Sequence, residues 1–131
     1  MKFKNILLVD DSEMDNYING YVVKEMEIAE TITVKNSAID ALTFLEHPEN
    51  LFPELIFLDI RMPKIDGFGF LENFLNFQEN KKQQCKIIML SSSMDPNDIS
   101  RARKHPNVVD YLNKPLTEEA LTETLDKLKF G

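Results

Sequence analysis

The chain has 131 residues, of which 43% are hydrophobic and 28% charged, a balance that argues against disorder and fibrous repeats. Acidic residues outnumber basic ones by 22 to 15, and the resulting formal charge of -7 argues against direct nucleic-acid binding. No apolar run can span a bilayer, and the single cysteine, Cys85, fits a reducing compartment. We therefore expect one acidic, cytoplasmic domain over residues 1–131, with no membrane contact.

Five short apolar runs alternate with segments of helical period. The runs cover residues 6–9, 31–34, 55–58, 87–90 and 108–112. Three of them are apolar throughout and rich in β-branched residues, which is typical of strands buried on both faces of a parallel sheet. The run 31–34 alternates polar and apolar residues instead and predicts an edge strand.

The segments between the runs predict five helices. The first carries an apolar stripe made of Met14, Ile18, Val22 and Met26 and widened by Tyr17 and Tyr21. Later helices are expected around 38–45 and 68–75, from Asp95-Pro96, and from Thr117, while 78–84 is interpreted as a frayed helix end plus loop. Five strand–helix units imply a parallel sheet covered by helices on both faces, a three-layer α/β sandwich.

Ionisable and hydroxyl residues follow four of the apolar runs. Asp10-Asp11-Ser12 follow the first, Asp59 the third, Ser91 to Ser93 the fourth and Lys114-Pro115 the fifth. Each has an ordinary structural role when taken alone; for example, Ser12 and Asp15 have the spacing of a helix capping box. Because parallel strands bring their carboxyl ends to one edge of the sheet, the set together favours a functional site there.

These residue types suit one kind of chemistry. Three carboxylates in a pocket repel one another unless a cation neutralises them, and hard oxygen ligands suit Mg²⁺. A carboxylate at the end of a central strand can act as the nucleophile towards a phosphoryl donor. A lysine ammonium and a hydroxyl are suitable partners for the charge on the transferred group.

The chain resembles the receiver domain of two-component response regulators, from Lys4 to Lys129. The most specific segment is 55–67, LIFLDIRMPKIDG, supported by Asp10-Asp11 upstream and Lys114-Pro115 downstream. The resemblance implies a flavodoxin-like fold with strand order 2-1-3-4-5. It also implies phosphorylation by a sensor histidine kinase or histidine phosphotransfer protein, and a conformational signal to a downstream protein. The domain would be a monomer, or a weak dimer through the fourth helix, fifth strand and fifth helix.

The resemblance also assigns roles to individual residues. Asp59 would be the phosphoacceptor, and Mg²⁺ would be held by Asp10, Asp11, Asp59 and the backbone carbonyl of Arg61. The switch would consist of Ser91, Tyr111, Lys114 and Pro115, with a hydroxyl at Ser91 that follows the phosphoryl group and a cis peptide before Pro115. The Arg61 side chain has two open interpretations: it shields the acyl phosphate from water, or it pairs with a nearby carboxylate.

Three alternatives compete with a receiver. An aspartate-nucleophile phosphatase of the haloacid dehalogenase type requires Asp-x-Asp after the first strand and a cap insertion, whereas here the aspartates are adjacent and the chain is short. A nucleotide- or flavin-binding module requires a glycine- or hydroxyl-rich loop where Asp10 and Asp11 stand. A receiver that works without phosphorylation would be expected to lack some of the acidic residues or Lys114. We therefore expect a receiver that catalyses only its own phosphorylation and dephosphorylation.

Overall fold

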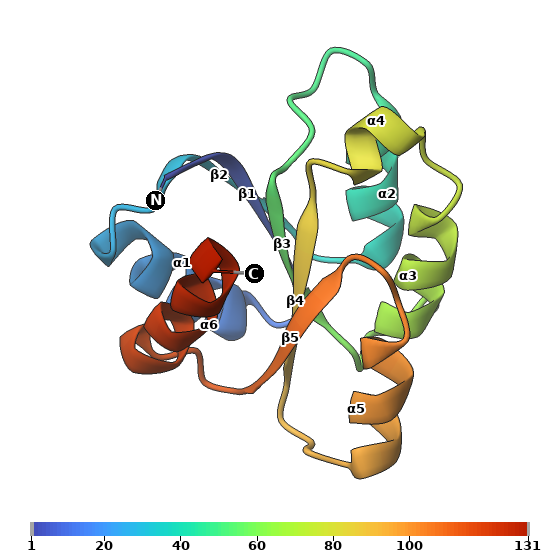
Figure 1. The fold of residues 1–131 in the computed structure, drawn as a ribbon. Coiled ribbons are helices and arrows are strands. Elements are labelled where there is room, and N and C mark those ends of the chain that lie inside the picture. The colour runs from blue at the N-terminus through green and yellow to red at the C-terminus, as the bar shows by residue number, and fades with distance from the viewer. Residues whose placement is uncertain (1, 131) are drawn as a thin grey trace.

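One parallel sheet of five strands organises the computed structural model, which describes residues 2–130 (Figure 1). The strand order is β2-β1-β3-β4-β5, as the resemblance implies. All five predicted strands are confirmed, and their bounds are β1 Phe3–Val9, β2 Ala29–Lys35, β3 Leu55–Asp59, β4 Lys86–Ser91 and β5 Val108–Asn113. β2 is an edge strand and is less buried than the central strands, in agreement with its alternating sequence.

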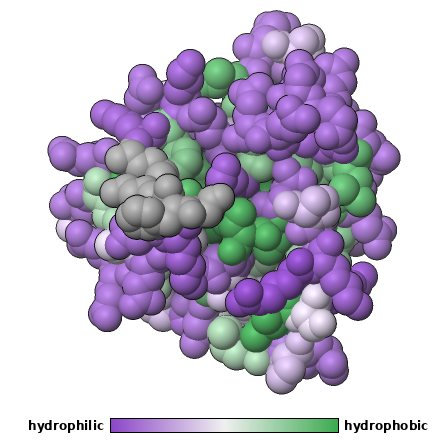
Figure 2. Space-filling model, viewed as in Figure 1, coloured by the Kyte–Doolittle hydropathy of each residue, from purple (hydrophilic) through white to green (hydrophobic). Residues whose placement is uncertain are grey.

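Helices cover both faces of this sheet. Helices α1 (Glu13–Glu25) and α6 (Glu118–Phe130) lie on one face (Figure 1). Helices α2 (Ala38–Glu46), α3 (Gly67–Phe74) and α5 (Pro96–Arg103) lie on the other, with the short α4 (Glu79–Lys82) on the same side. This is the predicted three-layer arrangement, and hydrophilic residues cover most of the face shown in Figure 2.

The central strands supply two apolar cores because successive side chains point to opposite faces of a sheet. Leu7 of β1 and Ile56 of β3 belong to the core beneath α2, α3 and α5. The neighbouring residues Leu8 and Phe57 belong to the core beneath α1 and α6. All four are 1% exposed or less, so strands buried on both faces account for the continuous apolar runs in the sequence.

The predicted apolar stripe of the first helix is buried only in part, since Val22 and Met26 pack against the core beneath α1 and α6 but its other end does not. Met14, Tyr17 and Tyr21 are exposed by 73%, 75% and 58%, whereas Asn16 and Asn19 are buried. Burial of Asn16 is offset in part: its Nδ2 donates to the Asp10 carbonyl at 2.8 Å and to Asn36 Oδ1 at 3.2 Å, while its Oδ1 has no hydrogen-bond partner among the described residues. The helix therefore buries Val23 together with the two asparagines and leaves the apolar side that carries Met14, Tyr17 and Tyr21 in solvent.

Residues 78–84 also differ from the prediction, because they include a helix of their own, α4. Lys82 fixes this segment: its Nζ donates to the Leu75 carbonyl at 2.8 Å and pairs with Glu79 Oε1 at 2.9 Å. Asn107 Nδ2 donates to the carbonyls of Lys82 and Cys85. A contact between segments 25 residues apart thus orders a stretch whose composition alone indicates a loop.

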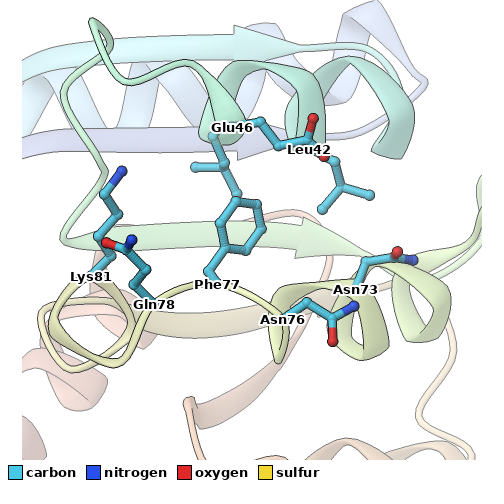
Figure 3. A pocket seen from close by; sticks show the side chains of 8 residues that line it. Leu42, Glu46, Asn73, Asn76, Phe77, Gln78 and Lys81 are labelled. Carbon is cyan, nitrogen blue, oxygen red and sulfur yellow. The ribbon is translucent and has the colours of Figure 1, made fainter.

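A cavity of about 340 Å³ lies between α2 and the α3–α4 segment (Figure 3). Phe77 points from this segment towards α2, and Leu42 and Lys81 also line the space. The cavity is at the C-terminal ends of α2 and α3, opposite to the strand ends at which the acidic residues stand. It shares no lining residue with the predicted site.

Among residues 2–130, no helix has both the length and the apolar character needed to cross a membrane.

Candidate functional site

Two buried aspartates stand at the carboxyl ends of neighbouring central strands. Asp10 follows β1 directly and Asp59 is the last residue of β3, with exposures of 2% and 6%. Because β1 and β3 pair in parallel, both strands end at the same edge of the sheet. Asp11 is exposed beside them, and carboxylate oxygens of all three residues lie within 4.8 Å of one another.

Lys114 reaches this cluster from the loop after β5. Its Nζ lies 2.6 Å from Asp10 Oδ2, 2.9 Å from Asp15 Oδ2 and 3.2 Å from Asp59 Oδ1. Burial by itself would lower the pKa of this ammonium group, but the hydrogen bonds to Asp10 and Asp15 and the negative charges of Asp59 and Asp10 together outweigh burial and raise it. Lys114 is therefore a fixed positive charge beside Asp59.

The charge balance around Asp59 favours a cation. Burial and the neighbouring Asp10 carboxylate raise the pKa of Asp59 to about 6, and Lys114 offsets them only in part. The three carboxylates form a hard oxygen donor set of the type that Mg²⁺ prefers, with room for water on the side of exposed Asp11. The residues present thus fit Mg²⁺, the ion that receiver domains generally bind at such a cluster. The Arg61 carbonyl as a further ligand stays a prediction.

Of the predicted switch residues, Ser91 ends β4, Tyr111 lies on β5, and Lys114 and Pro115 follow β5. The Ser91 carbonyl accepts the backbone N–H of Lys114 at 2.9 Å, and the Ser91 hydroxyl accepts the N–H of Ser93 at 3.0 Å. Tyr111 is buried, and its hydroxyl donates to the Ser93 carbonyl at 2.9 Å. Both side chains thus hold the same loop, and the peptide between Lys114 and Pro115 is cis, as the resemblance implies.

Arg61 forms an ion pair, which is one of its two interpretations from the sequence. Its Nη2 lies 2.8 Å from Asp98 Oδ2 on α5, so the loop after β3 is tied to the helix after β4. The Arg61 side chain is 63% exposed, and such surface pairs contribute roughly 0.2–1 kcal/mol. The pair is a tether between two segments rather than a main source of stability.

Gly67 places α3 directly against the end of β3. A Cβ atom at this position would lie 2.5 Å from the carbonyl oxygen of Asp59 and 2.8 Å from Cα of Ile60. Its N–H donates to the Ile60 carbonyl at 2.8 Å, and Asp66 caps the helix by accepting from Gly69 N. The Asp-Gly pair in the sequence is thus a helix start, and the glycine permits its close approach to the Asp59 backbone.

Sequence reasoning missed one residue of this site. The spacing of Asp15 predicts only a capping role, but its carboxylate is one of the three that contact Lys114. The two residues are 99 positions apart, so no local pattern could have paired them. Only the general observation that an acidic residue stands near the end of the first strand could have suggested it.

A family model described as "Response regulator receiver domain" matches residues 6–126. The chain therefore belongs to the response regulator receiver domain family, as the resemblance indicated. It is a receiver of two-component phosphorelays. The receiver domain family in general serves signalling rather than enzymatic turnover. Its members interact with histidine kinases or phosphotransfer proteins and with downstream targets.

Individual relatives agree with this assignment. A two component response regulator from Cytophaga hutchinsonii has a similar crystal structure, with a TM-score of 0.89, 29% identity and full coverage of both chains (100% each). A protein-glutamate methylesterase/protein-glutamine glutaminase of Maricaulis maris is 30% identical over 95% of this chain and 31% of its own length. The sensor histidine kinase CheAY of Helicobacter pylori is 27% identical over 93% of this chain and 14% of its own length. The chain thus spans less than a third of these two curated relatives.

Proposed function

We propose that Asp59 accepts a phosphoryl group from a phosphohistidine of a sensor kinase or a phosphotransfer protein. The observation that carries this proposal is the position of Asp59 at the end of β3, within 4.8 Å of the Asp10 and Asp11 carboxylates and 3.2 Å from Lys114 Nζ. A nucleophile surrounded by acidic metal ligands and one fixed cation suits phosphoryl transfer.

The transfer step balances without a further reactant. An oxygen of the Asp59 carboxylate attacks phosphorus, the P–N bond to the donor imidazole breaks, and the electron pair leaves with that nitrogen. Lys114 and the Ser91 hydroxyl then donate hydrogen bonds to oxygens of the new acyl phosphate. When bound by Asp10, Asp11, Asp59 and the Arg61 carbonyl, Mg²⁺ supplies positive charge that stabilises the transferred group.

The proposed signal follows from the change at Asp59. Phosphorylation replaces one carboxylate with a more highly charged group that has three acceptor oxygens. The Ser91 hydroxyl accepts from Ser93 N–H and keeps its own proton free to donate. A phosphoryl oxygen on Asp59 draws this hydroxyl towards itself and, through Ser93, moves the loop that Tyr111 holds. We infer that α5, β5 and α6 transmit this change to a downstream protein, and that any self-association is weak and uses the same elements.

An exposed apolar face next to the site supports docking of a protein donor. Met14, Tyr17 and Tyr21 have spacings of three and four residues, so they share one side of α1. The helix begins three residues after Asp10, which places this face close to the phosphoacceptor. Exposed aromatic and Met side chains are typical of interaction surfaces.

The remaining parts of the proposal concern the domain as a whole. We propose that residues 1–131 form one receiver domain, although residues 1 and 131 lie outside the described part of the chain. The reactions that it catalyses are the phosphorylation and dephosphorylation of its own Asp59. A cytoplasmic location is proposed because kinases phosphorylate their histidines with ATP there, and because Cys85 is a free thiol.

Intact-mass measurement after incubation with acetyl phosphate and Mg²⁺ tests the proposal. We expect one added phosphoryl group in the wild type and none in Asp59→Asn or in the presence of EDTA. Asp110→Asn is the matched control, because Asp110 is as buried as Asp59, 6% in each case, but lies outside the cluster. Equal labelling of Asp59→Asn and the wild type would show that another residue accepts the group.

A further inference from the structure

The capping box at the start of α1 is only half formed. Ser12 Oγ accepts from the backbone N–H of Asp15 at 3.2 Å, which is the expected first half. In the second half, the Asp15 carboxylate would accept the backbone N–H of Ser12. That N–H instead donates to Asp10 Oδ1 at 3.0 Å. The Asp15 carboxylate is therefore released from the capping role and turns to Lys114, 2.9 Å away.

Lys114 divides its contacts between two kinds of carboxylate. An ammonium group has three N–H donors, and Asp10, Asp15 and Asp59 are the three acidic partners around this one. Asp10 and Asp59 belong to the cluster that fits a divalent cation, whereas Asp15 does not. With a cation bound, the first two carboxylates share their charge with it, and the cation repels the ammonium group. Asp15 is the partner that keeps its full attraction for Lys114.

We propose that Asp15 is a positioning residue that holds the Lys114 ammonium beside Asp59 when the cation site is filled, so that Lys114 is in place as the phosphoryl group arrives. This role rests on the proposed function of Asp59 and adds to it a residue that acts through Lys114. The backbone of Asp15 is fixed by its bond to Ser12 Oγ, and its side chain is 34% exposed. The carboxylate is thus anchored at one end and partly shielded from solvent.

Phosphoryl uptake from acetyl phosphate at saturating Mg²⁺ tests this role, since saturation removes any effect of Asp15 on metal affinity. We expect Asp15→Asn to slow uptake about fivefold, because the Lys114 ammonium is then less often in the position that assists the transferred group. Glu13→Gln is the matched control: it removes one negative charge from the same exposed helix turn without a contact to Lys114 and should leave the rate unchanged.

Dependence on Lys114 separates positioning from a general structural effect. In the Lys114→Met background, Asp15→Asn should cause no further slowing. The same cycle of variants in EDTA should show coupling in the urea unfolding midpoint. Asp15→Asn should lower this midpoint more when Lys114 is present than in the Lys114→Met background. This second readout needs neither metal nor phosphate.

The outcomes discriminate between the two proposals. Unchanged or faster uptake by Asp15→Asn, equal slowing with and without Lys114, or no coupling in EDTA overturns the role of Asp15 alone. A wild type that takes up no phosphoryl group at all overturns the proposed function of Asp59, and the role of Asp15 with it.

Discussion

Asp59→Asn should stabilise the metal-free protein at neutral pH, although it removes the proposed functional residue. Folding moves Asp59 into a buried site next to Asp10, which raises its pKa from 3.8 to about 6. The folded protein therefore holds a proton that the unfolded chain has lost between these two pH values. Stability must fall as pH rises through this window, because the unfolded state binds fewer protons there.

The pKa of Asp59 gives the size of the effect. A rise from 3.8 to about 6 corresponds to about 3 kcal/mol of unfolding free energy lost by pH 7, because each pH unit corresponds to about 1.4 kcal/mol. An asparagine keeps the shape of the side chain but cannot ionise. We expect Asp59→Asn to be about 2–3 kcal/mol more stable than the wild type at pH 7 in EDTA, and the difference to vanish towards pH 4.

Urea unfolding curves at several pH values between 4 and 7.5, all in EDTA, measure this difference directly. Millimolar Mg²⁺ should then stabilise the wild type and reduce its disadvantage, since a ligand that binds only the folded state raises its stability. A variant less stable than the wild type at pH 7, or a difference independent of pH, would refute the argument that burial and Asp10 disfavour the Asp59 carboxylate.

Two further predictions concern the glycines of α1 and α3 and the contact between Thr124 of α6 and Asp110 of β5. Gly67→Ala should lower the unfolding free energy by about 2 kcal/mol, since the new Cβ would lie 2.5 Å from the Asp59 carbonyl; Gly20→Ala, with Leu8 Cδ1 at 3.5 Å, should raise it by about 0.5–1 kcal/mol. Thr124→Val should lower it by about 1–3 kcal/mol, because the buried Asp110 carboxylate loses the hydroxyl donor 2.6 Å away. Urea unfolding checks both, and a neutral Gly67→Ala or Thr124→Val would contradict the respective contact.

The sequence determined the strands and the position of the acidic residues. A parallel strand buried on both faces needs a continuous apolar run, and Ile6 to Val9 and Leu55 to Leu58 are runs of this kind. Since such strands all end at one edge of the sheet, the residues that follow them had to meet there. The order of residues along the chain is therefore enough to place Asp10, Asp59 and Lys114 at one edge of the sheet, and the strand order then makes Asp10 and Asp59 neighbours within reach of Lys114.

Tertiary structure alone decided which face of α1 is buried. Helical period shows that Met14, Tyr17 and Tyr21 share a side, but an apolar stripe can face a core or a partner equally well. Here Asn16 is buried, because its Nδ2 finds the Asp10 carbonyl and Asn36 as partners, although its Oδ1 has no hydrogen-bond partner among the described residues. A buried polar residue is acceptable only with such partners, and these are supplied by other segments.

The partners of individual charges were likewise beyond the sequence. Arg61 could have covered the acyl phosphate or found a carboxylate, and the position of α5 gives it Asp98. Asp15 has the spacing of a capping residue, yet the Ser12 N–H that it would have accepted donates to Asp10. The Asp15 carboxylate forms an ion pair with Lys114 instead. Local spacing determines which interactions are possible along the chain, whereas long-range pairing depends on distances that only the folded sheet and its loops define.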